Sequence, residues 1–125
     1  MIRYNLLILI ITSLLILSGC DKPSDTAANN LEAQAWTMIE QGALLVDVRT
    51  QQEYDQGALE NSLHIPHDQV ATKIVEFGND KNRQIVLYCR SGNRAGKAEA
   101  ILREMGYQNI LNAGGYEAMI KHKQQ

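Results

Sequence analysis

The sequence predicts a small α/β domain, in which a parallel sheet carries helices on both of its faces. Two apolar runs, over 44–48 and 84–88, have the length of buried strands, and segments with helical periodicity separate them. Buried strands that alternate with helices are typical of parallel sheets covered on both sides. Of the 125 residues, the 106 that follow residue 19 suffice for one compact domain and are too few for two.

The first half of this domain alternates between helix and strand. Two helix starts have the spacing of a capping box, in which side chains three positions apart each bond the other residue's backbone. These pairs are Asn29 with Glu32 and Thr50 with Glu53. The predicted elements are a helix over 31–41, a strand over 44–48, a short helix between Thr50 and Gly57, and a short strand over 62–65.

The second half continues the alternation around the second buried strand. Apolar residues at helical spacing predict a helix over 70–77 and another after the second buried strand. The helical faces consist of Val70, Ile74 and Phe77 in the first case, and of Ala98, Ile101, Leu102 and Met105 in the second. A last short strand is predicted over 109–111, and we interpret Gly114-Gly115 as a turn with unusual backbone angles.

A cysteine follows the second buried strand and begins a polar loop. The run Cys89-Arg90-Ser91-Gly92-Asn93-Arg94 lies directly before a predicted helix. Open α/β sheets place their ligand crevices at the carboxyl ends of strands, and loop amides at a helix start can hold an anion. The two guanidinium groups favour a thiolate over a thiol. The pattern therefore predicts that Cys89 is a nucleophile and that the protein is an enzyme.

The same residues carry a family resemblance. The run from Cys89 to Arg94 resembles the active-site loop of single-domain rhodaneses, which are sulfurtransferases. Other segments resemble further signatures of that family in the right order, and together they cover roughly residues 31–121: Leu45–Arg49 with Glu53 and Gly57, Asn61–Pro66, and Ala113–Tyr116. Three departures lie outside the loop: Ala58 replaces a usual His, Asn61 a common Gly, and Met119 a frequent Trp.

The resemblance implies a rhodanese-like fold and a specific chemistry. Sulfane sulfur would pass from thiosulfate or a similar donor to a thiophilic acceptor through a persulfide on Cys89. The loop amides would hold the outer sulfur, with Ser91, Gly92 and Asn93 shaping the loop and adding hydrogen bonds. Arg90 would bind the anionic donor. Arg94 would either contact substrate or pair with a carboxylate such as Asp47 or Glu53, and we expect no cofactor.

Two other polar groups invite functional interpretations that we do not favour. Asp47 and Arg49 lie at the end of the first buried strand. Because Asp47 interrupts an apolar run, it must either be paired or reach solvent, and we interpret the two residues as a structural ion pair near the site. His64 and His67 lie three positions apart, but zinc needs three or four converging ligands, and His122 lies on a charged tail. We therefore predict no metal site.

Three alternatives to sulfur transfer use the same residues. Cysteine-dependent phosphatases of the dual-specificity cell-cycle type share the rhodanese fold, and arsenate reduction belongs to the same class of chemistry. The phosphatase loop has five residues between Cys and Arg, whereas four separate Cys89 from Arg94, and the shorter ring suits a single sulfur atom. The third alternative is a module that binds a periplasmic protein partner or delivers persulfide sulfur to it.

The N-terminal segment predicts export as a bacterial lipoprotein. Arg3 precedes an apolar stretch over 6–17, which is shorter than the approximately 20 residues of a membrane span. Leu17-Ser18-Gly19-Cys20 resembles a lipobox, the signal whose cysteine receives lipid. We therefore predict a signal peptide over 1–19, a polar tether over 20–30 and the rhodanese-like domain over 31–125. An uncleaved anchor helix is the alternative.

These features predict the location and the partners. The domain would be anchored in a membrane of the cell envelope and would face the periplasm or the exterior. Asp21 resembles the signal that retains Gram-negative lipoproteins on the inner membrane. With Cys20 lipidated, Cys89 is the only free thiol of the two cysteines. The net charge of −2 and the lack of a basic stripe argue against nucleic acid, so the expected partners are the sulfur donor, the acceptor, which could be a protein, and the membrane.

Overall fold

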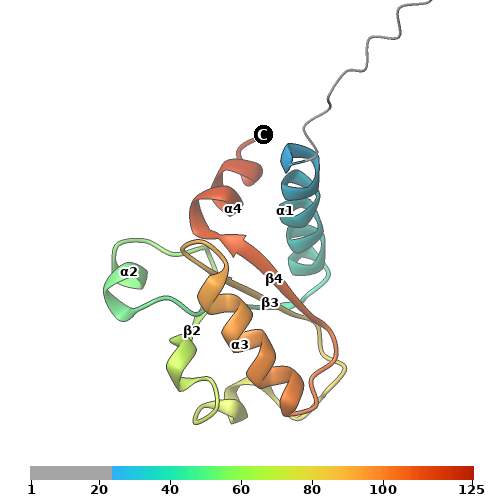
Figure 1. The fold of residues 1–125 in the computed structure, drawn as a ribbon, viewed down its shortest axis with the longest axis vertical. Helices are drawn as coiled ribbons and strands as arrows, with labels where there is room; N and C mark the ends of the chain where they lie inside the picture. The colour runs from blue at the N-terminus through green and yellow to red at the C-terminus, as the bar shows by residue number, and fades with distance from the viewer. Residues whose placement is uncertain (1–23) are drawn as a thin grey trace, which may run out of the picture.

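A four-stranded parallel sheet with the strand order β2-β1-β3-β4 forms the centre of the molecule (Figure 1). The computed structural model describes residues 24–125. The elements are α1 (Ser24–Glu40), β1 (Leu44–Asp47), α2 (Gln51–Asp55), β2 (Leu63–His64), 3-10 helices over His67–Gln69 and Ile74–Phe77, β3 (Ile85–Cys89), α3 (Asn93–Glu104), β4 (Ile110–Gly115) and α4 (Tyr116–Lys123). The predicted fold class is confirmed.

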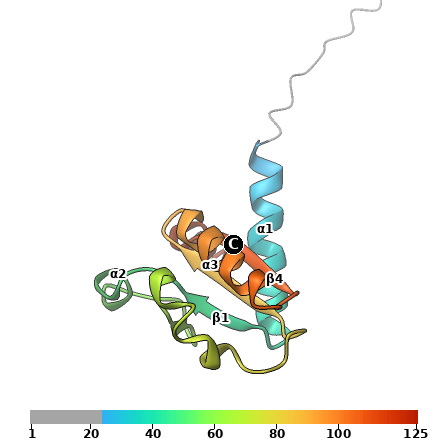
Figure 2. The same ribbon diagram turned by 60° about the horizontal axis from the view of Figure 1, so that its bottom comes forward.

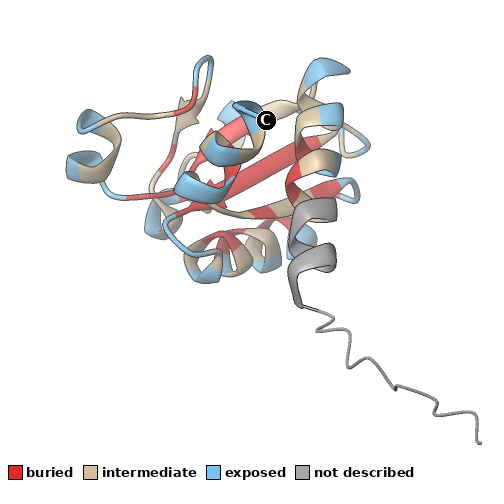
Figure 3. Ribbon diagram, turned by 90° about the horizontal axis from the view of Figure 1, so that it is seen from above, coloured by how far each residue is buried: buried red, intermediate tan, exposed pale blue. Residues whose placement is uncertain are grey.

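The sheet separates two hydrophobic cores. Side chains alternate along β3, so that Ile85 and Leu87 enter one core while Val86 and Tyr88 enter the other. The helix α3 and the 3-10 segments cover the first core, and α1 and α4 cover the second. Figure 3 shows that the buried residues are concentrated in the strands and in the helix faces toward them. The two faces of the sheet are thus both covered, as the continuous apolar runs require.

The helix α1 begins earlier than the sequence predicts. It starts at Ser24, so Asn29 and Glu32 lie inside the helix and do not cap its start. The second part of the segment that we predicted to be a tether is therefore helical. The residues from 24 to 28 explain this start, because a serine and an aspartate favour a first turn and two alanines favour its continuation.

Two predictions about the second half of the fold are wrong in detail. The segment 70–77 contains a 3-10 helix over Ile74–Phe77 and no α-helix, although Val70 and Phe77 are fully buried. A segment this short gains little from helical hydrogen bonds alone, so the burial of its apolar side chains decides its path. Met105 caps α3 and is 38% exposed, so it does not belong to the buried face of that helix.

The C-terminal part of the chain is more ordered than the sequence indicates. β4 continues to Gly115, and the segment that looks like a charged tail forms α4. Met119 of α4 is fully buried, and its carbonyl oxygen accepts a 3.0 Å hydrogen bond from the indole of Trp36 on α1. This contact holds α4 beside α1, and α1 lies on the side of the molecule away from α2 (Figures 1 and 2).

The N-terminal predictions concern residues that the structure does not describe. The signal peptide over 1–19, lipidation at Cys20 and the first part of the tether lie outside residues 24–125. Within residues 24–125, none of the helices combines the length and the apolar character that crossing a membrane requires.

Candidate active site

The polar loop after β3 lies at the carboxyl edge of the sheet. Cys89 is the last residue of β3, a central strand between β1 and β4, and α3 begins four residues later at Asn93. Gly92 turns the chain from strand to helix with a φ of 94°, a left-handed conformation that favours glycine. Ser91 and Asn93 are exposed on either side of it. The thiol of Cys89 therefore lies at the carboxyl end of a central strand, which is where parallel sheets bind their ligands.

The loop backbone surrounds the sulfur of Cys89. The side chain is buried, with 1% of the residue exposed, and the amide of Gly92 donates a 3.0 Å hydrogen bond to Sγ. Burial by itself raises the pKa of the Cys89 thiol. Hydrogen bonds from the amides of Ala95, Ser91, Gly92 and Arg94 outweigh burial, so that the pKa of the thiol is lowered from its ordinary value. The loop therefore stabilises the thiolate, the nucleophilic form of cysteine, more than the surroundings of an ordinary cysteine do.

Arg94 is held from outside the loop by Glu53 of α2. Its Nη1 and Nη2 lie 2.6 and 2.8 Å from the two carboxylate oxygens of Glu53. Thr50 completes the predicted capping box with Glu53 and so fixes the carboxylate on α2. Hydrogen bonds from Arg94 and from Thr50 lower the pKa of Glu53 to about 2. The pairing raises the pKa of Arg94, as does its contact with Cys89 to a smaller extent.

Arg90 occupies a different position from Arg94. Its side chain is exposed and forms no ion pair with any residue in the described part of the chain. It lines an open pocket of about 500 Å³ between α2, the loop after β3 and the start of α4. Cys89 itself does not line this pocket, because its sulfur is covered by the loop. A positive charge is therefore available beside the thiol, directly at the pocket.

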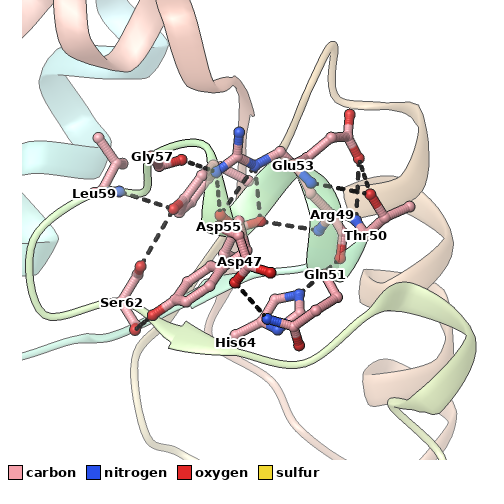
Figure 4. A network of polar contacts seen from close by, with 12 residues as sticks. Asp47, Arg49, Thr50, Gln51, Glu53, Asp55, Gly57, Leu59, Ser62 and His64 are labelled. Carbon is pink, nitrogen blue, oxygen red and sulfur yellow. Dashed lines mark hydrogen bonds and ion pairs between the residues drawn. The ribbon is translucent and has the colours of Figure 1, made fainter.

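Asp47 and Arg49 form a buried ion pair at the end of β1 (Figure 4). Arg49 Nε lies 3.0 and 2.9 Å from the two carboxylate oxygens, and Nη2 lies 2.6 Å from Oδ2. Nη2 also donates to the carbonyl oxygen of Gly57 at 2.7 Å, and the ring of Tyr116 covers the guanidinium at 4.2 Å. The pair therefore ties β1 to the loop after α2 and to α4.

The back of the active-site loop rests on the end of β4, which sequence reasoning did not single out. Asn112 Nδ2 donates a 2.9 Å hydrogen bond to the carbonyl oxygen of Gly92, and Asn112 Oδ1 accepts one of 3.0 Å from the amide of Gly114. A Cβ at Gly115 would lie 2.6 Å from the carbonyl oxygen of Arg90, so only glycine fits there. The one signal for this role is a polar residue within an otherwise apolar strand.

The two histidines near β2 have structural surroundings. His64 Nε2 lies 2.9 Å from the carbonyl oxygen of Arg49, and its ring stacks on Tyr54 with 4.4 Å between the centroids. His67 begins a 3-10 helix. Within residues 24–125, no group of three or more His, Cys, Asp or Glu side chains is arranged to hold a metal ion.

Comparisons with known proteins agree with this geometry. The Rhodanese family, described as rhodanese-like domain, matches residues 31–122. Thiosulfate sulfurtransferase PspE of Escherichia coli K12 is 39% identical over 70 residues, which cover 56% of this chain and 67% of that protein. A tRNA uridine(34) hydroxylase of Erwinia tasmaniensis is 35% identical over 97 residues, or 74% of this chain, but the match spans only 28% of the hydroxylase.

The structures agree as well. A solved structure described as rhodanese with anions from Escherichia coli has a TM-score of 0.58 and 35% sequence identity, and the match covers 62% of this chain and 91% of that one. The family match, from residue 31 to residue 122, includes the whole sheet, the thiol loop and both residues of the Arg94–Glu53 pair. This chain belongs to the rhodanese-like domain family.

Proposed function

We propose that the protein is a sulfurtransferase that moves sulfane sulfur from thiosulfate or a similar donor to a thiophilic acceptor. The observation that carries this proposal is the thiol of Cys89, whose pKa is lowered by converging backbone amides at the carboxyl edge of the sheet. The similarity to a relative named thiosulfate sulfurtransferase supports it.

In the first step the Cys89 thiolate attacks the outer sulfur of the donor. The new bond joins Sγ to that sulfur, the sulfur–sulfur bond of thiosulfate breaks, and sulfite leaves with its electron pair. The product is a persulfide on Cys89. Its outer sulfur is anionic near neutral pH, and the backbone amides that lower the pKa of the thiol are suited to hold this charge.

In the second step the acceptor attacks the outer sulfur of the persulfide. The bond between this sulfur and Sγ breaks, and its electron pair returns to Sγ as a thiolate. The two arginines have separate tasks in this scheme. Arg90 is exposed and free to attract the anionic donor, whereas Arg94 is bound at both terminal nitrogens by Glu53 and maintains the loop.

A phosphatase or an arsenate reductase would need the same loop to bind an oxyanion with several oxygen atoms, and not a single sulfur atom. A phosphoryl group or an arsenate needs a guanidinium that can bind two of its oxygens. The fork of Arg94 already binds both oxygens of Glu53, which leaves the loop better suited to one sulfur atom than to an oxyanion. This arrangement favours sulfur transfer over both alternatives.

A parallel assay of the purified full-length protein tests the proposed function. With thiosulfate and cyanide we expect thiocyanate to accumulate over many turnovers, and with an aryl phosphate ester we expect no release of phosphate. Release of phosphate without thiocyanate would show that the protein is a phosphatase. If neither product forms although Cys89 takes up sulfur from thiosulfate, the protein is a persulfide-delivery module for another protein.

We further propose that the enzyme acts at a membrane outside the cytoplasm through a lipid on Cys20. The lipobox-like sequence before Cys20 supports this, and acyl chains contribute about 0.8 kcal/mol for each buried methylene group. Cells that express the protein should incorporate labelled palmitate into the wild type and not into Cys20→Ser. Equal labelling of the two, or none in either, contradicts lipidation at this residue.

A further inference from the structure

The amides that face the sulfur of Cys89 come largely from the beginning of α3. The amide of Gly92 donates a 3.0 Å hydrogen bond to Sγ, and the amides of Ser91, Arg94 and Ala95 also favour the thiolate. Arg94 and Ala95 lie in the first turn of α3. Because a hydrogen bond weakens steeply when its angle departs from linearity, these amides act on the sulfur only while the helix start keeps its position. Whatever holds the helix start therefore also controls the thiol.

The start of α3 needs support from outside the helix. Its N-cap position is occupied by Gly92, which has no side chain that could accept a hydrogen bond from the first turn. The φ of 94° at this glycine gives the turn its direction, but glycine also has the largest backbone freedom of all residues. The orientation of this turn therefore depends on a neighbouring element.

Asn112 of β4 provides this support. Its Nδ2 donates a 2.9 Å hydrogen bond to the carbonyl oxygen of Gly92, which also accepts a 2.9 Å hydrogen bond from the amide of Gly96. The bond from Gly96 belongs to the first turn of α3, whereas the bond from Asn112 comes from the sheet. One carbonyl oxygen thus joins the helix start to β4.

A second hydrogen bond fixes the orientation of the Asn112 side chain. Its Oδ1 accepts a 3.0 Å hydrogen bond from the amide of Gly114. A backbone amide only donates and a carbonyl oxygen only accepts, so a single orientation of the side chain satisfies both Gly114 and Gly92. The segments also meet closely here, since a Cβ at Gly92 would lie 3.3 Å from Cα of Gly114 and 3.6 Å from Oδ1 of Asn112. The side chain is therefore a short and fixed link between β4 and the thiol loop.

We propose that Asn112 is a positioning residue for the reaction, because it holds the beginning of α3 so that the loop amides stay directed at the sulfur of Cys89. Both of its hydrogen bonds go to backbone groups, at Gly92 and Gly114, so it acts through the loop and not on a substrate. Its consequence for sulfur transfer rests on the proposed function, whereas its effect on the thiol does not.

The pH dependence of thiol alkylation in the full-length protein tests this role. Reaction of Cys89 with iodoacetamide is followed at a series of pH values by mass spectrometry of its peptide, which keeps it separate from Cys20. Two variants are compared with the wild type. Asn112→Ala removes both hydrogen bonds of the side chain. Asn112→Asp keeps the size of the side chain and an acceptor for Gly114, but places a carboxylate oxygen against the carbonyl oxygen of Gly92.

We expect the alkylation profile of Asn112→Ala to move to higher pH, because amides that are less well directed stabilise the thiolate less. Below the midpoint of the wild-type profile, alkylation should slow by about three- to tenfold, the effect of losing one hydrogen bond's worth of stabilisation. Asn112→Asp should slow it more, since its negative charge also opposes the thiolate. Above both midpoints the rates of variants and wild type should converge, which general damage to the fold would not produce.

Asn109 offers a matched control at the other end of β4. Its Nδ2 donates a 2.6 Å hydrogen bond to the carbonyl oxygen of Asn82, so Asn109→Ala also removes an asparagine bond to a backbone carbonyl. We expect its alkylation profile to coincide with that of the wild type. Uptake of sulfur from thiosulfate should follow the same pattern as alkylation, with slower uptake by the Asn112 variants at low pH and equal uptake at high pH.

The outcomes separate this role from the proposed function. If the alkylation midpoint of the Asn112 variants equals that of the wild type, or if their rates fall by the same factor at every pH, Asn112 does not position the amides. The same conclusion follows if circular dichroism shows that both variants are unfolded, because Asn112 then supports the fold as a whole. If the midpoint moves as expected but the wild type takes up no sulfur from thiosulfate, the effect on the thiol stands and the sulfurtransferase function is wrong.

Discussion

Replacing Cys89 by serine is expected to abolish sulfur transfer and to leave the fold intact. In the proposed mechanism the thiolate forms the bond to the donor's sulfur, and a hydroxyl in its place is a far poorer nucleophile. Cys89 is also the only cysteine within the described residues, so no other thiol there can replace it. Because the side chain is buried and serine is slightly smaller, the surrounding loop can keep its conformation.

Mass spectrometry and circular dichroism of the full-length variant check this expectation. Treatment with thiosulfate should add one sulfur atom to the wild type and none to Cys89→Ser, while the far-ultraviolet spectra of the two remain the same. The amide hydrogen bonds should also leave the wild-type thiol reactive toward iodoacetamide below the pH at which an ordinary thiol loses its reactivity. Persistent thiocyanate formation by Cys89→Ser would exclude Cys89 as the sulfur carrier.

Local patterns in the sequence were sufficient to predict the thiol's position. The apolar run over 84–88 indicates a buried strand, and the polar residues after it indicate a loop, so Cys89 had to lie at the strand's end. The capping box of Thr50 and Glu53 is equally local, and the structure confirms both of its hydrogen bonds. Such features depend on a few neighbouring residues, which is why spacing alone can reveal them.

Long-range contacts could not be predicted in the same way. Both Asp47 and Glu53 were candidate partners for Arg94, and spacing does not distinguish between them. The choice follows from Arg49, which occupies the carboxylate of Asp47 and leaves Glu53 to Arg94. The support that Asn112 gives to Gly92 depends on the pairing of β4 with β3 and on the irregularity between Leu87 and Cys89 in that pairing. No local pattern contains this information.

Replacing Asp47 by alanine is expected to lower the free energy of unfolding by about 3–5 kcal/mol, the usual cost of leaving one partner of a buried ion pair alone. Both side chains are buried, and Asp47 accepts every hydrogen bond that Arg49 Nε donates. Burial by itself lowers the pKa of Arg49, but the hydrogen bonds and charge of Asp47 raise it overall. Without Asp47 the guanidinium would remain charged and buried. Its remaining favourable contacts would be the hydrogen bond to the carbonyl of Gly57 and the faces of the tyrosine rings.

Urea denaturation of three variants separates this effect from a general sensitivity of the fold. Glu99→Ala breaks the more exposed pair with Arg103 on α3 and should cost no more than about 0.5 kcal/mol. The double variant with Asp47→Leu and Arg49→Met removes both charges and should regain a large part of the stability that Asp47→Ala loses, because no unpaired charge stays buried. If the double variant is less stable than Asp47→Ala, the contacts that Arg49 keeps in the single variant, which are its hydrogen bond to Gly57 and its packing on the tyrosine rings, stabilise the fold by more than the unpaired charge costs.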